Sequence, residues 1–341
     1  MNIKKLNLVH TPVEGLQFFP LNIIYDDEKI QSWFFCNYIQ LEWVKDWCII
    51  FAMQEKHYVG NPFIETQVLT RDTLYGITEN IAEFIINRIN HGWYIQFCLD
   101  EFYIPQKDSY KREHSIHDNM IYGYNREDKT FNLFGYDKTR KLNMTQAGFT
   151  DVNQGFKEME GLLSPEEAES LAYYNTIFLI RKDEKAKYSF DIFCLIRQLK
   201  DYMEGNNYSI KFRMIQNPNL ENMYGVNIYD KLAKDFTLGN EDVIYDKRLL
   251  HTIYEHKNIM YLRVKYLIET KIIPPDENLL CEFEDILKKA QLIRNLQLKY
   301  VLKTDSKILS RISVVIQEMK EREIAAIQKL VSMLEYSSVN E

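Results

Sequence analysis

The residues with the clearest capacity for chemistry are a histidine and an aspartate on one predicted β-hairpin. Residues 116–124 (IHDNMIYGY) and 130–136 (TFNLFGY) are rich in aromatic and branched side chains, and the polar loop 125–129 (NREDK) separates them, as is typical of two antiparallel strands. If the residues that border the loop face each other, His117 faces Asp137 with Cβ atoms about 5 Å apart. The carboxylate could then orient the imidazole as a general base. A purely structural pair has the same pattern, and a slip of one residue would separate the two side chains.

A thiol would complete this pair as a nucleophile, because a nearby imidazole and a helix N-terminus both favour a thiolate. Residues 36–47 carry apolar side chains near helical spacing, so we expect Cys36 to open a helix. Gln31, five residues earlier, could contribute an amide to an oxyanion hole together with the backbone N–H of Cys36. Most cysteines are small buried hydrophobic residues. Cys98, in the middle of a predicted strand, is the rival nucleophile.

The pattern along the rest of the chain predicts an α+β fold with an antiparallel sheet in an N-terminal domain, residues 1–155, and a mainly helical domain, residues 156–341. Strands are expected at residues 93–99 and 176–181, and helices at residues 81–90 with Thr78 as the cap, from Ser164 and Pro165 onward, and at residues 189–204, 241–270, 277–302 and 307–334. The helical domain could cover the catalytic site.

Composition limits the class of protein. The 341 residues include 46% hydrophobic residues and carry a net charge of −7, with 42 basic and 49 acidic side chains. This balance predicts a folded protein and argues against a general nucleic-acid binder. The five cysteines have no metal-type spacing, and no segment approaches the length of an apolar membrane span. We therefore expect a cytoplasmic protein that binds neither nucleic acid nor membrane, while the sequence leaves its oligomeric state open.

A metal site at the hairpin is not expected either. His114 and His117 are three residues apart, and residues three apart on a strand point to opposite faces of the sheet. The two imidazoles would reach a single ion only if the segment around His114 were a loop.

Several of these features together resemble the papain-like fold. The chain has an early cysteine on a predicted helix, a strand that runs into residues 100–105 (DEFYIP), the motif H-x-x-H-D-x-x-x-Y-G-Y at residues 114–124, and an aromatic strand that ends at Asp137. Over roughly residues 20–150 the arrangement is similar to that of the butirosin-type acyltransferases of natural-product biosynthesis, relatives of the bacteriocin-processing cysteine peptidases. Residues 224–232 (YGVNIYDKL) resemble the helical C-terminal part of such proteins.

The resemblance implies an acyltransferase of antibiotic-type biosynthesis that forms an amide. An acyl group, held as a thioester on the phosphopantetheine of an acyl or peptidyl carrier protein, would pass through Cys36 to a small amine, with no cofactor of the enzyme's own. His117 would be the base, Asp137 its orienter and Gln31 the oxyanion donor. The segment FFCNYIQL around Cys36 lacks the Cys-Gly or Cys-Trp pair common in peptidases. The alternatives are a papain-like cysteine peptidase and a papain-like binding protein without catalytic activity.

Basic residues gather on both sides of the open end of the hairpin. Carrier proteins are typically acidic, so such residues could guide docking, although a solvated surface rim has the same composition. We call the following residues the basic rim: Lys111, Arg112, Lys138, Arg140 and Lys141.

Overall fold

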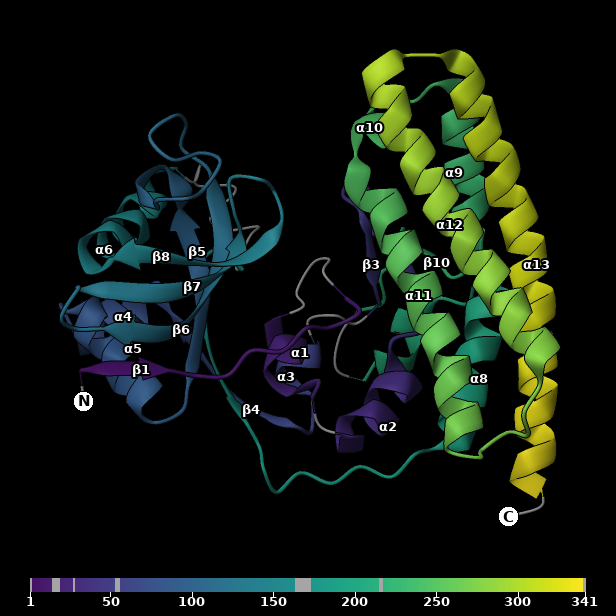
Figure 1. Ribbon diagram of the computed structural model, residues 1–341, viewed down its shortest axis with the longest axis horizontal. Helices are drawn as coiled ribbons and strands as arrows, with labels where there is room; N and C mark the ends of the chain where they lie inside the picture. The colour runs from purple at the N-terminus through teal and green to yellow at the C-terminus, as the bar shows by residue number, and fades with distance from the viewer. Residues whose placement is uncertain are drawn as a thin grey trace. The chain divides into compact units, whose positions relative to one another are not determined.

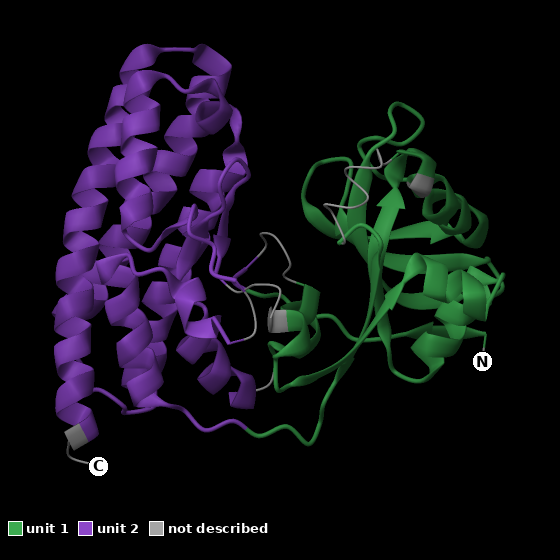
Figure 2. Ribbon diagram, turned by 180° about the vertical axis from the view of Figure 1, so that it is seen from behind, with its two compact units in different colours: residues 1–11, 19–26, 57–187 green, residues 12–18, 27–56, 188–341 purple. Residues whose placement is uncertain are grey.

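The structure is a computed structural model that describes residues 2–13, 19–26, 28–52, 56–162, 173–214 and 217–339. The chain forms two compact units, each built from several segments (Figure 2). Unit 1 comprises residues 1–11, 19–26 and 57–187, and unit 2 comprises residues 12–18, 27–56 and 188–341.

Unit 1 is built around a seven-stranded sheet in which every described pairing is antiparallel (Figure 1). The strand order is β4-β9-β5-β6-β7-β8, and β1 pairs with the far end of β6. The strands are β1 (Ile3–Lys5), β4 (Ile64–Thr70), β5 (Tyr94–Asp100), β6 (Ile116–Asn125), β7 (Thr130–Tyr136), β8 (Leu142–Gly148) and β9 (Thr176–Lys182).

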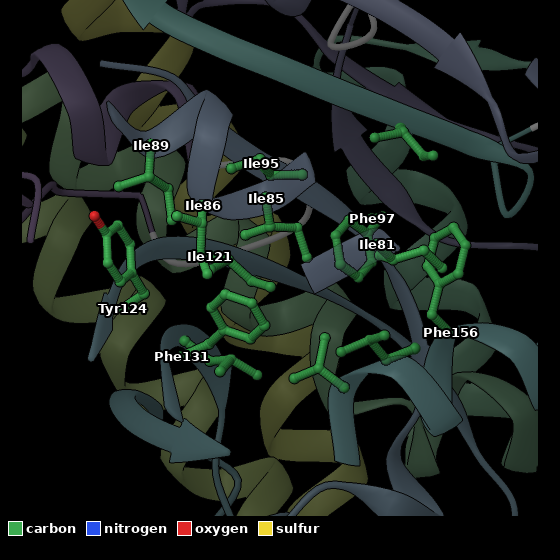
Figure 3. Packing of buried hydrophobic residues seen from close by; sticks show 14 of the residues in the cluster. Ile81, Ile85, Ile86, Ile89, Ile95, Phe97, Ile121, Tyr124, Phe131 and Phe156 are labelled. Atoms are coloured by element: carbon green, nitrogen blue, oxygen red, sulfur yellow. The ribbon is translucent and has the colours of Figure 1, made fainter. Parts of the chain in front are cut away.

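Helices and sheet of unit 1 share a hydrophobic core (Figure 3). Alternate residues of β5, Ile95 and Phe97, point into it with the isoleucines of α5, which recur at three- and four-residue spacing and so form one apolar stripe. Asn80 caps the start of α5 by accepting a hydrogen bond from Glu83 N–H. The helices of this unit are α1 (Phe19–Ile24), α3 (Lys56–Val59, from its second residue on), α4 (Arg71–Ile77), α5 (Ile81–Asn90), α6 (Phe149–Glu158), and the 3-10 turns η1 (Glu101–Tyr103) and η2 (Met159–Leu162).

Unit 2 combines long packed helices with a small three-stranded antiparallel sheet, ordered β10-β2-β3. Helix α12 packs against α11 and α13, and α13 also packs against α8 and α9. The elements are α2 (Glu28–Asn37), β2 (Leu41–Trp43), β3 (Ile49–Phe51), α8 (Ile192–Glu204), η3 (Tyr208–Phe212), β10 (Met223–Tyr224), α9 (Asn227–Leu238), α10 (Glu241–Tyr245), α11 (Lys247–Glu269), α12 (Glu277–Lys303) and α13 (Ser306–Val339). Within the described ranges, none of the chain's helices is both long enough and apolar enough to cross a membrane.

The predicted class is confirmed: the protein is α+β, with an antiparallel sheet and a helical C-terminal region. The domain boundary differs from the prediction at residue 155, which lies inside α6, a helix that packs on β5. Unit 1 continues to residue 187 because β9 inserts between β4 and β5. The predicted helix over residues 36–47 is wrong, since α2 ends at Asn37 and the chain then forms β2. The predicted helix that begins at Ser164 and Pro165 lies outside the described residues.

Other predicted elements match closely. Strands β5 and β9 and helices α5, α8, α12 and α13 lie where the patterns place them. Thr78 does not cap α5, because it ends α4 instead. The segment 241–270 is two helices rather than one: Asp246 separates α10 from α11 and accepts a hydrogen bond from Arg248 N–H at the start of α11.

Candidate functional site

The hairpin of β6 and β7 positions the first candidate residue. Next to the turn the pairing is Asn125 with Thr130, one step away from the predicted alignment. An irregularity between Ile121 and Gly123 restores the predicted alignment farther along, where Met120 faces Phe134. His117 lies on β6 beyond the last described pair with β7, and its direct partner on the other side is Leu99 of β5.

His117 is oriented by Glu101, the residue that follows β5. Its Nδ1 lies 3.0 Å from Glu101 Oε2, so the neutral ring donates Nδ1–H to the carboxylate and leaves Nε2 as a proton acceptor. The His117 side chain is 52% exposed and that of Glu101 only 6%. The imidazole is therefore half-exposed while the carboxylate that binds it is held inside the protein.

Two further groups hold the buried carboxylate. The Lys107 ammonium, which is fully buried, lies 3.1 Å from Glu101 Oε1, and Lys107 also donates to Tyr136 O at 2.7 Å. Asn119 Nδ2 donates to the same carboxylate oxygen at 3.4 Å. A buried carboxylate costs free energy unless it is paired and hydrogen-bonded, and these contacts meet that requirement.

The electrostatics of this group favour the protonated form of His117. The hydrogen bond that His117 donates to Glu101 raises the pKa of His117 above its ordinary value, partly opposed by burial. Burial alone would raise the pKa of Glu101, but its contacts with His117 and Lys107 outweigh burial and lower it. Glu101 is thus ionised at neutral pH, and it stabilises the imidazolium form of His117.

Asp137 is not the orienter of His117, which corrects the prediction. Strand β7 ends at Tyr136, and Asp137 starts a tight turn. Its Oδ1 accepts hydrogen bonds from Thr139 Oγ1 at 2.6 Å and from the Thr139 N–H, and its Oδ2 accepts one from Asn143. These bonds, led by that from the Thr139 hydroxyl, lower the pKa of Asp137 to about 2. The Asp137 carboxylate therefore stabilises the turn after β7.

We expect Asp137→Asn to change the turnover of any reaction at His117 by less than about twofold, since the carboxylate does not touch the imidazole. A steady-state rate measured at the pH optimum tests this. A loss comparable to that caused by replacing Glu101 would restore Asp137 as the orienter.

Cys36 does not open a helix. It is the second-last residue of α2, where the helix dipole disfavours a thiolate. The residue is fully buried, its Sγ contacts Asp191 O at 3.7 Å, and burial raises the pKa of the thiol to about 11. Cys36 belongs to unit 2 and His117 to unit 1. An activated thiolate is therefore not supported at this position.

Gln31 does not complete an oxyanion hole with Cys36. Both lie on α2, and five residues along an α-helix correspond to about 140° around its axis. A residue in the last turn of a helix also commits its N–H to the carbonyl four residues earlier. The rival nucleophile, Cys98, lies on β5 beside Leu99, so it points to the face opposite His117, and burial raises the pKa of its thiol well above the ordinary value.

A second histidine–carboxylate pair lies next to the first. His114 Nδ1 is 2.6 Å from Asp100 Oδ2, and the ring stacks on Phe102 with centroids 4.4 Å apart. The segment around His114 is indeed a loop before β6. Even so, no group of three or more metal-ligating side chains is present among the described residues.

The basic rim is partly neutralised. Arg112 and Arg140 both form ion pairs with Asp108, at 3.3 and 2.8 Å, and the backbone N–H of Lys138 donates to Gln106 O. The loop before β6 and the turn after β7 therefore lie side by side. All five residues of the basic rim are exposed: Lys111, Arg112, Lys138, Arg140 and Lys141.

No protein-family model matches this chain, and no curated protein matches it at a significant level.

Proposed function

We propose that the protein is an amide-forming acyltransferase in which His117, oriented by Glu101, is the general base. The observation that carries the proposal is the 3.0 Å bond between Nδ1 of the half-exposed His117 imidazole and a buried, ionised carboxylate, which leaves Nε2 as the proton acceptor of the neutral ring. The papain-like resemblance of the hairpin motif supplies the substrate class. The amide synthetase of closthioamide assembly resembles the same papain-like group.

In the proposed reaction the amine nitrogen attacks the thioester carbonyl carbon directly, without an acyl-enzyme. The carbon–nitrogen bond forms, and His117 Nε2 takes a proton from the nitrogen, so that the thiolate leaves rather than the amine. The carbon–sulfur bond then breaks, and the imidazolium returns its proton to the departing thiolate. Glu101 stabilises the imidazolium between the two transfers. The buried, neutral thiol of Cys36 favours this route over transfer through Cys36.

The donor we propose is an acyl or peptidyl carrier protein. Its acidic surface and phosphate would meet the exposed basic rim, whose free ammonium groups include those of Lys138 and Lys141. No cofactor takes part in the proposed steps, because both proton transfers use a side chain of the protein.

The direct test is aminolysis of a small thioester. The protein is mixed with an acyl thioester of N-acetylcysteamine and a panel of primary amines. Amide formation is measured by mass spectrometry, and thiol release is measured with a colorimetric thiol reagent. We expect amide formation well above the uncatalysed rate. Thiol release without amide would indicate a hydrolase or peptidase, and binding without turnover would indicate a non-catalytic protein.

Cys36→Ala separates the direct route from the covalent one. We expect the variant to keep most of its transfer activity, because the thiol is buried and its raised pKa leaves only about one thiolate in ten thousand at neutral pH. Mass spectrometry of the intact wild-type protein after a short incubation should show no acyl adduct. Loss of turnover together with loss of a trapped adduct would re-establish Cys36 as the nucleophile.

Glu101→Gln should move the pH dependence of the transfer rate. The base works when neutral, so the rate rises with pH through the pKa of His117, which Glu101 raises. Without the carboxylate's charge, the inflection should fall towards the ordinary histidine value, near 6.5. The plateau rate should fall by about tenfold, since the amide still orients the ring but no longer stabilises imidazolium. An unmoved inflection would show that the dyad does not control the rate.

A further inference from the structure

Lys107 is a charged side chain that the proposed reaction does not use. Its side chain has no exposed surface, and it bonds only inside unit 1, to Glu101 Oε1 at 3.1 Å and to Tyr136 O at 2.7 Å. Burying an ammonium is costly. A buried lysine does not increase solubility as a surface lysine does, so the burial of Lys107 calls for another explanation.

Space for this ammonium is left by a missing side chain. A Cβ added at Gly135 would lie 3.2 Å from Lys107 Nζ and 2.9 Å from Asn119 Oδ1. Gly135 does not have a positive φ, so its backbone does not require glycine. The absence of a side chain at Gly135 on β7 thus leaves room for the Lys107 ammonium next to the Glu101 carboxylate.

Lys107, Glu101 and His117 form a series of charged groups in contact. Lys107 contacts one oxygen of Glu101, and His117 contacts the other. Two further charged groups act on this series, Asp118 on β6 and Asp137 after β7, and both favour the charged form of Lys107. Lys107 in turn opposes protonation of His117, while Glu101 and Asp118 favour it.

We propose that Lys107 is a positioning residue that shares the charge of the Glu101 carboxylate and so limits how strongly this carboxylate favours protonation of His117. The link to catalysis depends on the proposed function, whereas the effect on the titration of His117 does not. Without Lys107 the whole carboxylate charge would act on the imidazole, and His117 would remain protonated to higher pH.

Lys107→Met, which removes the charge but keeps the length of the chain, tests this. The His117 ring signals are followed by NMR as a function of pH, and assigned with a His117→Gln variant. We expect the midpoint to rise by roughly half a unit to one unit. The matched control is Lys138→Met, which removes the same charge from the exposed turn nearby and should leave the midpoint unchanged. A midpoint that is unchanged or lower in Lys107→Met overturns the proposal.

Gly135→Ala keeps the test decisive if Lys107→Met does not fold. The added methyl group displaces the ammonium without removing it, so the midpoint should move upward by a smaller amount. A lysine with only a structural role would lower stability in both variants and leave the midpoint in place. If the wild type catalyses no aminolysis but the midpoint shifts as expected, the proposed function fails while the role of Lys107 stands.

Discussion

Replacing His117 with alanine should lower the rate of amide formation by about 100-fold or more, because general-base catalysis typically contributes that much. In the proposed route no other group accepts the amine proton, so the zwitterionic intermediate would expel the amine instead of the thiol. The rate is measured with the small thioester and amine, at saturating concentrations of both, on protein shown to be folded.

The matched control is His114→Ala. His114 lies three residues away, is similarly exposed, with 46% of its side chain accessible, and also donates to a buried carboxylate, that of Asp100. It should retain most of the activity. Added imidazole should partly restore His117→Ala and not affect the control. If the losses were reversed, His114 and Asp100 would be the catalytic pair.

Much of unit 1 can be predicted because its signals are local. Strand β5, the hairpin of β6 and β7, and β9 all follow from short runs of aromatic and branched residues between polar loops. The error over residues 36–47 has a physical cause: Ile39, Val44 and Trp47 lie near helical spacing, but the pairing of β2 with both β3 and β10 fixes residues 41–43 as a strand. The pairing with β10 joins Met223 to Trp43 and Tyr224 to Glu42, which are distant in the sequence, and no local pattern contains that information.

The carboxylate that orients His117 was not predicted, for a similar reason. The hairpin pattern predicted Asp137 as the orienting carboxylate, whereas Glu101 follows β5, the strand on the other side of β6. Strand β5 pairs Leu99 with His117, so the chain just after β5 passes the ring. The acidic pair Asp100 and Glu101 was visible in the sequence as a strand end. The local pattern did not contain the pairing of β5 with β6, which brings Glu101 next to His117.

Unit 2 contains a buried polar network whose disruption should have the largest effect on stability. Lys257 Nζ lies 2.6 Å from Glu323 Oε1, and both side chains are fully buried. The hydroxyl groups of Tyr202 and Tyr229 donate to the other carboxylate oxygen at 3.1 and 3.0 Å. Lys257 also donates to His256 Nδ1 at 2.9 Å. Helices α8, α9, α11 and α13 all contribute to the network.

Glu323→Leu should lower the free energy of unfolding by about 3–5 kcal/mol, because it leaves the Lys257 ammonium buried without its carboxylate. Burial already lowers the pKa of Lys257 to about 8, so the charged form is held mainly by Glu323. Urea unfolding followed by tryptophan fluorescence measures the loss. Three of the four tryptophans, Trp33, Trp43 and Trp47, belong to unit 2, and a Trp93→Phe background removes the signal of unit 1.

Glu318→Leu is the matched control. It makes the same substitution on α13, but Glu318 is 48% exposed and pairs with Lys289 at the surface, so the free energy of unfolding should change far less than in Glu323→Leu. The double variant Lys257→Met with Glu323→Leu should recover much of the stability lost in Glu323→Leu, since replacing both members of a buried pair removes the uncompensated charge. A double variant as unstable as the sum of the two single variants would contradict this account. Stability would then depend on the tyrosine hydroxyls that donate to Glu323, since these lose their acceptor whichever residue replaces it.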